Sequence, residues 1–326
     1  MTKKTDSAVT LAEVARRAGT STAVVSYVIN NGPRPVAAAT RARVLAAAEE
    51  LGYRRNRAAA ALRTGASELV GLIVPDTINP YFAALGRSIE NALTHAGKLA
   101  VVVNSGYGVQ RQTDAAERLL SAQVDGLVIV SAAGATDLAT GHSTPTVYVH
   151  HRPASSPAEL VAADNTAAVR HAVEHLHSHG HEQVAFLAGP GNDGPVGQRL
   201  AAWRSTDAGE TVLRSDFSRA EAAELIAHHA VRATLPRALI TATDEQAIGV
   251  LAAASQHEVA IPEDLAVISC DGTPESAYTA PALTVTEQPL HQMALRTANI
   301  ILDDGEAEPP TAARLVPRRS CGCPFD

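Results

Sequence analysis

The sequence predicts a small all-α head followed by a larger α/β body, and three observations support this fold class. The first ~55 residues contain short amphipathic helical patterns separated by glycines. From Glu68 onward, short β-rich runs alternate with helical runs, which is typical of parallel sheets covered by helices. Charge also divides the chain, because residues 1–66 have eleven Lys and Arg against four Asp and Glu, whereas residues 67–326 have sixteen against thirty. The basic head therefore predicts a polyanionic partner for the head alone.

The composition fits a folded protein without a membrane segment. The 326 residues are 46% hydrophobic, which is enough for about two domains with real cores. The longest apolar stretches are far shorter than the ~20 residues that span a membrane, and the N-terminus lacks the apolar core of a signal peptide. Only three cysteines occur, so no disulfide framework is expected. We expect a cytoplasmic protein that contacts no membrane.

The head begins with two short helices. Thr10 and Glu13 form a capping box that starts a helix over 11–18, and Gly19 ends it. Ser21 is placed to cap a second helix from Thr22 to Asn30. Two short helices joined by a tight glycine turn predict a helix-turn-helix. An ordinary helical hairpin has the same spacing, but the basic charge disfavours it.

A third helix and a possible linker helix follow. The third is expected at about 38–51, with Val44, Leu45, Ala48 and Leu51 facing inward. The stretch 56–63 has high helix propensity but is too short to be stable alone, so it should fold only on a partner. Alternatively, it is a plain interdomain linker with Leu62 packed on the body.

The body contains more strands than one doubly wound sheet usually holds. Nine strands are expected, at 69–74, 99–104, 126–131, 146–150, 160–163, 183–188, 212–214, 238–241 and 266–270. Helices are expected at 80–96, 110–122, 166–179, 218–233, 244–257 and 290–302. The series breaks near 150–165, which predicts two similar lobes.

The head resembles the LacI/GalR family of bacterial transcription regulators. The matching motifs are Leu11-Ala-Glu-Val-Ala, Ala18-Gly-x-Ser21, Val25-Ser-x-Val-x-Asn30, Thr40-Arg-x-Arg-Val44 and Leu51-Gly-Tyr53. The resemblance implies that the second helix enters the major groove and that Thr22, Ala23 and Tyr27 read bases. It also implies a hinge helix that binds the minor groove with its dimer mate through Ala59 and Leu62. The DNA-binding positions implied are Thr10, Ser21, Thr22, Ala23, Ser26, Tyr27, Asn30, Thr40, Asn56, Arg57, Ala59 and Leu62.

Two residues of the head depart from the family pattern. Tyr27 stands where the family usually has Arg, so the operator is expected to be atypical. Ala37 replaces the usual Ser cap of the third helix, a change that typically costs ~1 kcal/mol.

The resemblance extends over the body. It is carried by Gly71-Leu-Ile-Val-Pro-Asp-x-x-Asn-Pro-Tyr-Phe82, Asp125-Gly-Leu127, Asp164-Asn165, His175-Leu-x-x-x-Gly-His181, Ala188-Gly-Pro190, Asp271-Gly and Leu283-Thr-Val-Thr-x-Gln288. It implies two lobes like the type I sugar-binding proteins of the periplasm, with a ligand in the cleft beyond the strand ends. The implied effector positions are Asn79, Tyr81, Phe82, Asp164, Arg199, Phe217, Thr243, Asp271 and Gln288, although any one of them could instead be a cap or core residue, Asp164 above all.

Three other patterns are interpreted as structural. Gly189-Pro-Gly-Asn-Asp-Gly194 fits a dinucleotide-binding turn, but its prolines and its place in the second lobe argue against one. His171, His175 and His179 have a spacing that could bind a metal, yet they also fit a solvated helix end. Cys321 and Cys323 are interpreted as structurally neutral residues of a mobile tail, without a redox or metal-binding role. The sequence therefore predicts no cofactor, no metal and no catalytic site.

The resulting hypothesis is a sequence-specific DNA-binding transcriptional regulator, most simply a repressor. It is expected to act as a cytoplasmic, nucleoid-associated homodimer on a palindromic double-stranded operator, under the control of a sugar or nucleoside. The expected domains are a DNA-binding domain at 1–55, a hinge at 56–66, and an effector-binding and dimerisation domain at 67–326. A sugar- or nucleotide-dependent enzyme with a helical appendage is the alternative. A periplasmic solute carrier is disfavoured by the missing signal peptide and the basic head.

Overall fold

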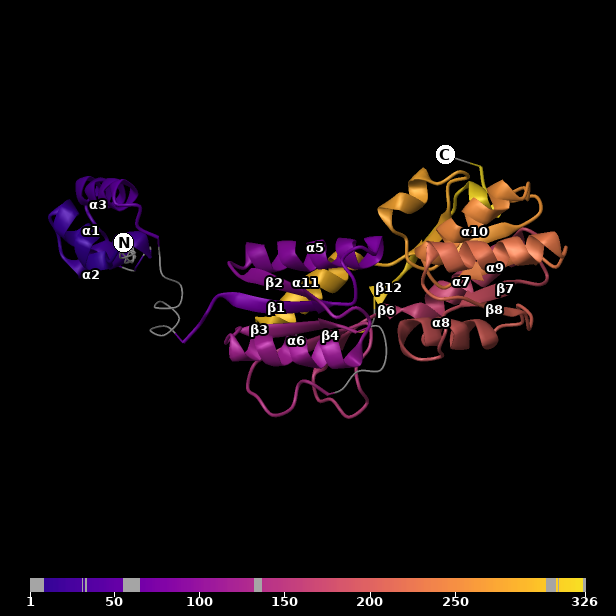
Figure 1. Ribbon diagram of the computed structural model, residues 1–326, viewed down its shortest axis with the longest axis horizontal. Coiled ribbons are helices and arrows are strands. Elements are labelled where there is room, and N and C mark those ends of the chain that lie inside the picture. Colours follow the sequence, from indigo (N-terminus) through magenta and orange to yellow (C-terminus); the bar gives the residue numbers. More distant parts are fainter. Residues whose placement is uncertain are drawn as a thin grey trace, which may run out of the picture. The chain divides into compact units, whose positions relative to one another are not determined.

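The computed structural model (Figure 1) describes residues 9–30, 32, 34–54, 65–131, 137–302, 309 and 311–324. The chain divides into two compact units, Met1–Ser67 and Glu68–Asp326. Four predicted DNA-binding positions of the hinge, namely Asn56, Arg57, Ala59 and Leu62, lie outside the described residues. No helix among the described residues is both long and apolar enough to cross a membrane.

The described part of the first unit contains three helices packed around a small core of valines and alanines. They are α1 (Leu11–Ala18), α2 (Thr22–Ile29) and α3 (Ala38–Glu50). The predicted capping box is formed, with the Thr10 amide donating to Glu13 Oε2 at 2.8 Å and the Glu13 amide donating to Thr10 Oγ1 at 3.3 Å. Gly19 ends α1 at φ 63°, a left-handed conformation that glycine adopts at little cost. Both helices of the helix-turn-helix therefore start as predicted, and α2 ends one residue earlier than expected, with Asn30 as its C-cap.

One inward residue of α3 was predicted wrongly. Leu45 is 47% exposed, whereas Val44, Ala47 and Ala48 are buried. The buried positions follow the three- and four-residue spacing of one helix face, and Leu45 lies about 100° away from Val44 around the helix.

The second unit contains two lobes, each a parallel sheet with helices on both faces. The sheet of the first lobe has the order β2-β1-β3-β4-β5. Its strands are β1 (Leu69–Val74), β2 (Leu99–Asn104), β3 (Gly126–Val130), β4 (Thr146–Val149) and β5 (Glu159–Val161). Helices α5 (Pro80–His95) and α11 (Leu290–Ile301) pack on one face, and α6 (Val109–Ser121) packs on the other. Figure 1 shows the sheet between these layers.

The alternation of side chains along β1 explains the two layers of the first lobe. Val70, Leu72 and Val74 face the core beneath α5 and α11, whereas Ile73 faces the core beneath α6. All four are fully buried, as expected for a central strand of a doubly wound sheet.

The second lobe repeats the arrangement with one reversed strand. Its sheet has the order β13-β11-β10-β9-β7-β8, in which only β13 is antiparallel to its neighbour. The strands are β7 (Ala185–Ala188), β8 (Val212–Arg214), β9 (Ala238–Thr241), β10 (Ala266–Ser269), β11 (Thr284–Glu287) and β13 (Arg314–Val316). Helices α7 (Asn165–Ser178) and α8 (Gly194–Arg204) cover one face, and α9 (Arg219–Val231) and α10 (Asp244–Gln256) cover the other.

The chain passes between the lobes more often than predicted. It leaves the first lobe after β5, close to the expected break, but α11 returns to pack on α5. Two short strands, β6 (Ala163–Asp164) and β12 (Thr311–Ala312), pair with each other at these connections. Two short 3-10 helices, η1 (Pro274–Tyr278) and η2 (Arg319–Cys321), complete the second lobe. A single division of the chain at 150–165 is therefore wrong for the residues after β11.

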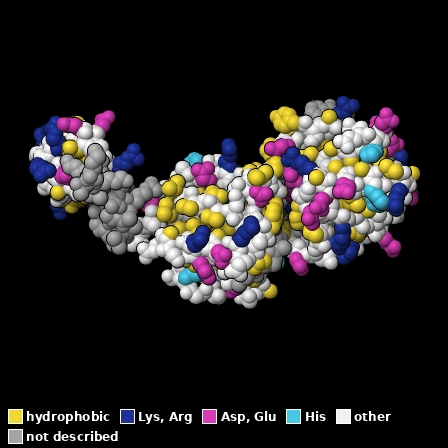
Figure 2. Space-filling model, viewed as in Figure 1, with side chains coloured by type: hydrophobic (Ala, Val, Ile, Leu, Met, Phe, Trp, Pro, Cys, Tyr) yellow, Lys and Arg dark blue, Asp and Glu magenta, His cyan; other side chains and the backbone are white. Residues whose placement is uncertain are grey.

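Charged side chains of both signs are interspersed on the visible surface of the second unit (Figure 2). Its net acidity is thus distributed over this face and does not form a single acidic patch.

Candidate functional site: a pocket between the two lobes

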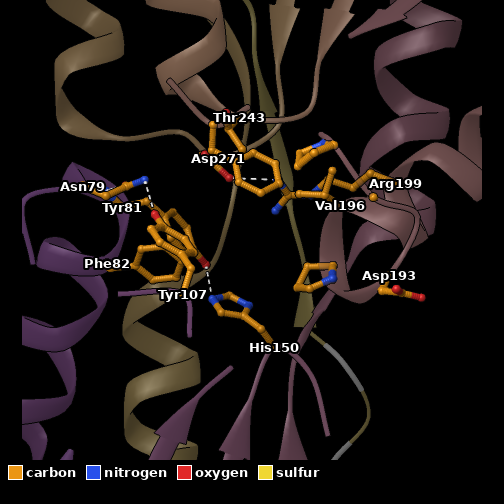
Figure 3. Close-up of a pocket in the computed structure, with 14 residues that line it drawn as sticks. Asn79, Tyr81, Phe82, Tyr107, His150, Asp193, Val196, Arg199, Thr243 and Asp271 are labelled. Carbon is orange, nitrogen blue, oxygen red and sulfur yellow. Dashed lines mark hydrogen bonds and ion pairs between the residues drawn. The ribbon is translucent and has the colours of Figure 1, made fainter. Parts of the chain in front are cut away.

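The second unit encloses a cavity of ≈ 280 Å³ that is lined from both lobes (Figure 3). Each lobe contributes residues that directly follow the carboxyl ends of its strands, where ligands bind in open α/β sheets. The lining residues are Asn79, Tyr81, Phe82, Tyr107, His150, Pro190, Gly191, Asp193, Pro195, Val196, Arg199, Phe217, Thr243 and Asp271.

Four aromatic rings form a continuous wall of this pocket. Tyr81 and Phe82 meet edge to face, with ring centroids 5.4 Å apart. Phe82 contacts Tyr107 at 6.1 Å, and Tyr107 lies 6.5 Å from Phe217 at an interplanar angle of 30°. The last contact joins the two lobes, since Tyr107 follows β2 and Phe217 follows β8. Such a wall offers flat apolar faces on which a ring-shaped ligand can stack.

A buried ion pair provides the charged groups of the pocket. Arg199 Nη1 lies 2.9 Å from Asp271 Oδ1, and both side chains are less than one-tenth exposed. Arg199 also donates from Nε to Asn165 Oδ1 at 2.9 Å and from Nη1 to the Ala242 carbonyl. No partner among the described residues is assigned to Nη2, which leaves that group for a ligand.

Burial and pairing set the ionisation of these groups. Burial raises the pKa of Asp271 to about 6, although the Arg199 guanidinium opposes this rise. Burial opposes the charge of Arg199, but the Asp271 carboxylate, together with smaller contributions from Cys270 and Tyr81, outweighs it, so the arginine pKa is raised. Burial, with a smaller contribution from Arg199, lowers the pKa of His150 to about 3. At neutral pH these three buried groups of the pocket are therefore a paired cation, a paired carboxylate and a neutral imidazole.

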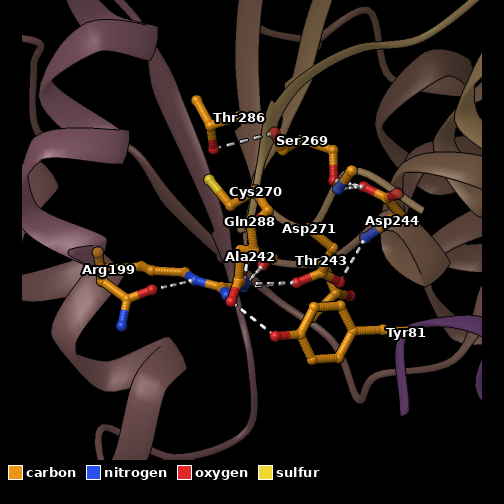
Figure 4. Close-up of polar contacts among 12 residues, drawn as sticks. Tyr81, Arg199, Ala242, Thr243, Asp244, Ser269, Cys270, Asp271, Thr286 and Gln288 are labelled. Atoms are coloured by element: carbon orange, nitrogen blue, oxygen red, sulfur yellow. Dashed lines mark hydrogen bonds and ion pairs between the residues drawn. The ribbon is translucent and has the colours of Figure 1, made fainter. Parts of the chain in front are cut away.

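A hydrogen-bond chain connects the first lobe to this ion pair (Figure 4). The Tyr81 hydroxyl donates to Gln288 Oε1 at 2.6 Å, and Gln288 Nε2 donates to Asp271 Oδ1 at 3.4 Å. His150 Nε2 lies 3.0 Å from the Tyr81 hydroxyl. Because that hydroxyl gives its single proton to Gln288, His150 completes the contact as the Nε2–H tautomer. A change in the separation of the lobes must stretch or break this chain.

The helix-turn-helix of the first unit presents small side chains at the start of α2. Thr22 and Ala23 are exposed, whereas Ser21 accepts from the Val24 amide at 3.3 Å as the helix cap. Asn30 Nδ2 donates a hydrogen bond to Ser26 Oγ at 3.1 Å. The Tyr27 ring is half-buried beside Gly32, with the Arg34 guanidinium carbon 5.8 Å from its centroid.

Two family models match this chain. The model of bacterial regulatory proteins of the lacI family matches residues 10–56, and a periplasmic-binding-protein-like domain matches residues 173–321. The HTH-type transcriptional regulator reg1 of Streptomyces lividans is 31% identical over 330 residues, covering 94% of this chain and 93% of the relative.

Two solved structures are similar to this chain over nearly its full length. A lac repressor dimer bound to operator and the anti-inducer ONPF has a TM-score of 0.84 at 25% identity, covering 97% of this chain and 99% of that one. A complex of the transcriptional regulator CelR with cellobiose has a TM-score of 0.67 at 26% identity, covering 96% and 99%.

The chain belongs to the lacI family. It is a transcriptional regulator with a helix-turn-helix followed by a two-lobed α/β domain, as the sequence predicted. The alternative of a sugar- or nucleotide-dependent enzyme is not supported, because the relatives are transcriptional regulators.

The structure gathers most of the predicted effector positions of this lacI-family protein in one pocket. Seven line it, namely Asn79, Tyr81, Phe82, Arg199, Phe217, Thr243 and Asp271. Gln288 lies behind the wall, where it supports Tyr81 and Asp271. Asp164 does not line the pocket but caps α7, since its Oδ1 accepts from the Ala167 amide at 2.9 Å. The alternative interpretation of Asp164 as a helix cap is therefore the one observed.

Sequence reasoning missed Tyr107, His150 and the turn that precedes α8. A signal was available for the first two, because Tyr107 and His150 directly follow strands that were predicted. The turn between Gly189 and Gly194 was considered as a dinucleotide motif, and its first residues as part of the family resemblance, but not as a wall of the pocket. A Cβ on Gly189 would lie 2.5 Å from the Phe217 ring, so the absence of a side chain there accommodates the aromatic wall. The predicted DNA-binding positions Thr10 and Thr40 lie in the capping box and on α3.

Proposed function

We propose that this lacI-family protein is a sequence-specific DNA-binding regulator whose operator affinity is controlled by a neutral sugar bound between the lobes. The observation that supports this most strongly is that one cavity contains both the aromatic wall and the buried Arg199–Asp271 ion pair, in which the two charges neutralise each other. The proposed domains are the DNA-binding domain at 1–55, the hinge at 56–66, and the effector-binding and dimerisation domain at 67–326.

The chemistry of the pocket favours an uncharged polyol over an anion. Aromatic rings stack on the apolar face of a sugar, and the free Nη2 of Arg199 with the carboxylate of Asp271 can bond adjacent hydroxyls. Among the described lining residues Arg199 is the sole positively charged side chain, and its ion pair with Asp271 already neutralises it. A phosphorylated ligand would therefore find no uncompensated cation. The volume lies near the lower limit of small-molecule sites, roughly 300 Å³, which favours a small ligand.

The ligand would act by changing the relation of the two lobes. It would touch Tyr81 of the first lobe and Arg199 of the second, and the Tyr81–Gln288–Asp271 chain already joins them. A ligand shifts an equilibrium only by its differential affinity for the two states. We propose that this difference is transmitted through residues 56–66, where a pair of marginally stable hinge helices would form on DNA.

The assembly and location are proposed from the relatives. A lac repressor dimer binds operator, and a regulator named CelR binds cellobiose. By analogy this chain would act as a homodimer on a palindromic operator, in the cytoplasm and associated with the nucleoid.

A thermal-shift screen of the full chain tests the ligand class. Neutral mono- and disaccharides, their phosphate esters and nucleosides would be compared on the wild type, Asp271→Asn, and the surface control Asp114→Asn. A neutral sugar should raise the melting temperature of the wild type and of Asp114→Asn, but not of Asp271→Asn. Stabilisation by a phosphate ester or a nucleoside alone would contradict the sugar assignment.

A further inference from the structure

Four potential metal ligands meet in the second lobe, away from the effector pocket. His175 and His179 are one turn apart near the end of α7, and Cys321 and Cys323 flank Gly322 at the end of η2. One ligand atom of each residue lies within 4.8 Å of the ligand atoms of the other three. Residues separated by more than 140 positions in sequence are thus brought to a single point.

Three of the distances between these atoms match the edges of a small tetrahedron. His175 Nε2 lies 3.2 Å from Cys321 Sγ and 3.5 Å from Cys323 Sγ, and His179 Nε2 lies 3.4 Å from Cys323 Sγ. A tetrahedral zinc with its usual bond lengths would separate nitrogen and sulfur ligands by about 3.5 Å. These three nitrogen–sulfur separations are therefore those expected of a tetrahedral zinc site, and all four ligand atoms lie within 4.8 Å of one another.

The local structure holds the cysteines in place. Cys321 is 1% exposed and belongs to the core beneath α7, where Thr284 Oγ1 donates to its sulfur at 3.0 Å. Gly322 has φ 97°, and a Cβ there would lie 3.4 Å from His179 Nδ1. Glycine thus provides the left-handed turn between the cysteines, and the His179 imidazole lies directly against it. The expectation that these cysteines are neutral residues of a mobile tail is wrong, because the segment packs on the second lobe.

We propose that His175, His179, Cys321 and Cys323 bind one Zn²⁺ ion. Two sulfur and two nitrogen ligands in tetrahedral arrangement are typical of structural zinc sites in proteins. Two thiolates and two neutral imidazoles also balance the charge of the ion in a half-buried site. All four positions are taken by the protein, so the ion is structural, and it fastens the C-terminal segment to α7.

Metal content measured on the full-length chain tests this site. The protein would be purified under reducing conditions, dialysed against metal-free buffer after loading with Zn²⁺, and analysed by elemental mass spectrometry. Wild type should retain about one zinc per chain. Cys323→Ser and His179→Gln should retain less than a fifth of that amount. His171→Gln, one turn earlier on the same helix but outside the cluster, should retain it fully.

The cobalt spectrum of the wild type provides a second test, and this spectrum does not depend on the folding of the variants. Co²⁺ bound by two thiolates and two imidazoles should show intense visible bands of four-coordinate geometry and a thiolate charge-transfer band in the near ultraviolet. Added Zn²⁺ should displace the cobalt and abolish both sets of bands. In a separate thermal melt, removal of zinc should lower the melting temperature of the wild type by several degrees but should not change that of His179→Gln. Wild type that holds no zinc, or that carries a Cys321–Cys323 disulfide under reducing conditions, would overturn the proposal. Equal zinc retention by His179→Gln would also overturn it.

Discussion

Arg199 and Asp271 are the buried charged residues of the pocket between the lobes, and their burial makes each depend on the other. Both are less than one-tenth exposed, and removing one partner leaves the other uncompensated. The carboxylate also accepts the Asp244 amide at 3.1 Å, so its position is set by the start of α10 as well as by arginine. Asp271 is consequently the residue whose protonation should be visible in ligand binding.

Effector affinity should fall as the pH is lowered through about 6. Burial raises the pKa of Asp271 to about 6, so the carboxylate is ionised above this pH and protonated below it. A ligand that needs the ionised form should bind about tenfold more weakly at pH 5 than at pH 7. Isothermal titration of the sugar found in the screen would measure the profile. A flat profile between pH 5 and pH 7, with the fold intact by circular dichroism, would show that Asp271 does not contact the ligand.

Two neighbouring glycines allow the aromatic wall to be tested with a matched pair of variants. A Cβ on Gly189 would lie 2.5 Å from the Phe217 ring, whereas a Cβ on Gly191 would meet nothing within 4 Å. Gly189→Ala should displace Phe217 and weaken the ligand about fivefold or more, since overpacking costs about 1 kcal/mol or more. Gly191→Ala should leave the dissociation constant within about twofold. Equal effects of the two substitutions would mean that Phe217 does not shape the ligand site.

At the scale of elements, the sequence predicted the strands that position the pocket but not the whole topology. Periodicity and β-branched runs located β1 to β5 and β7 to β10 to within a few residues. The short strand β11 and helix α8 were missed as elements, because β11 follows an irregular segment and Pro195 sits at the start of α8. That α11 returns to the first lobe depends on packing with α5, which no local pattern encodes.

The N-terminus of α3 lacks a side-chain cap, so a capping substitution there should stabilise the first unit. Ala37 occupies the cap position with no side-chain bond to the helix, although its backbone is extended there. Ala37→Ser should accept from the helix amides and stabilise α3 by about 1 kcal/mol. Amide hydrogen exchange of residues 38–50 would measure the change, with the exposed mid-helix Ala46→Ser as control. Slower exchange in both variants, or in neither, would contradict the capping argument.

The proposed hinge predicts a specific defect in DNA binding. Leu62→Ala should weaken binding to operator much more than binding to random DNA, because a leucine wedge acts only where the duplex can be kinked. Fluorescence anisotropy with both DNAs at one salt concentration would measure the ratio. Equal losses on the two DNAs would instead favour a plain linker over a hinge helix.

At the scale of the whole molecule, residues 56–66 are the proposed link between the DNA-binding unit and a ligand site that lies between two lobes. The ligand would contact residues that follow strands of both lobes, and a hydrogen-bond chain already links Tyr81 to Asp271. The proposed hinge helix would be marginally stable, so a small change in the lobes would suffice, because coupling of about 1–3 kcal/mol changes affinity about five- to 150-fold.

The most direct test is the operator affinity of the full chain with and without the sugar, measured side by side for wild type and Asp271→Asn. The operator would be obtained by selection from randomised DNA. Wild-type affinity should change about five- to 150-fold when the sugar is added. Asp271→Asn should bind the operator within about twofold of wild type without sugar and should not respond to it. A variant that kept the full response, or a wild type whose operator affinity ignored a bound sugar, would contradict the central claim.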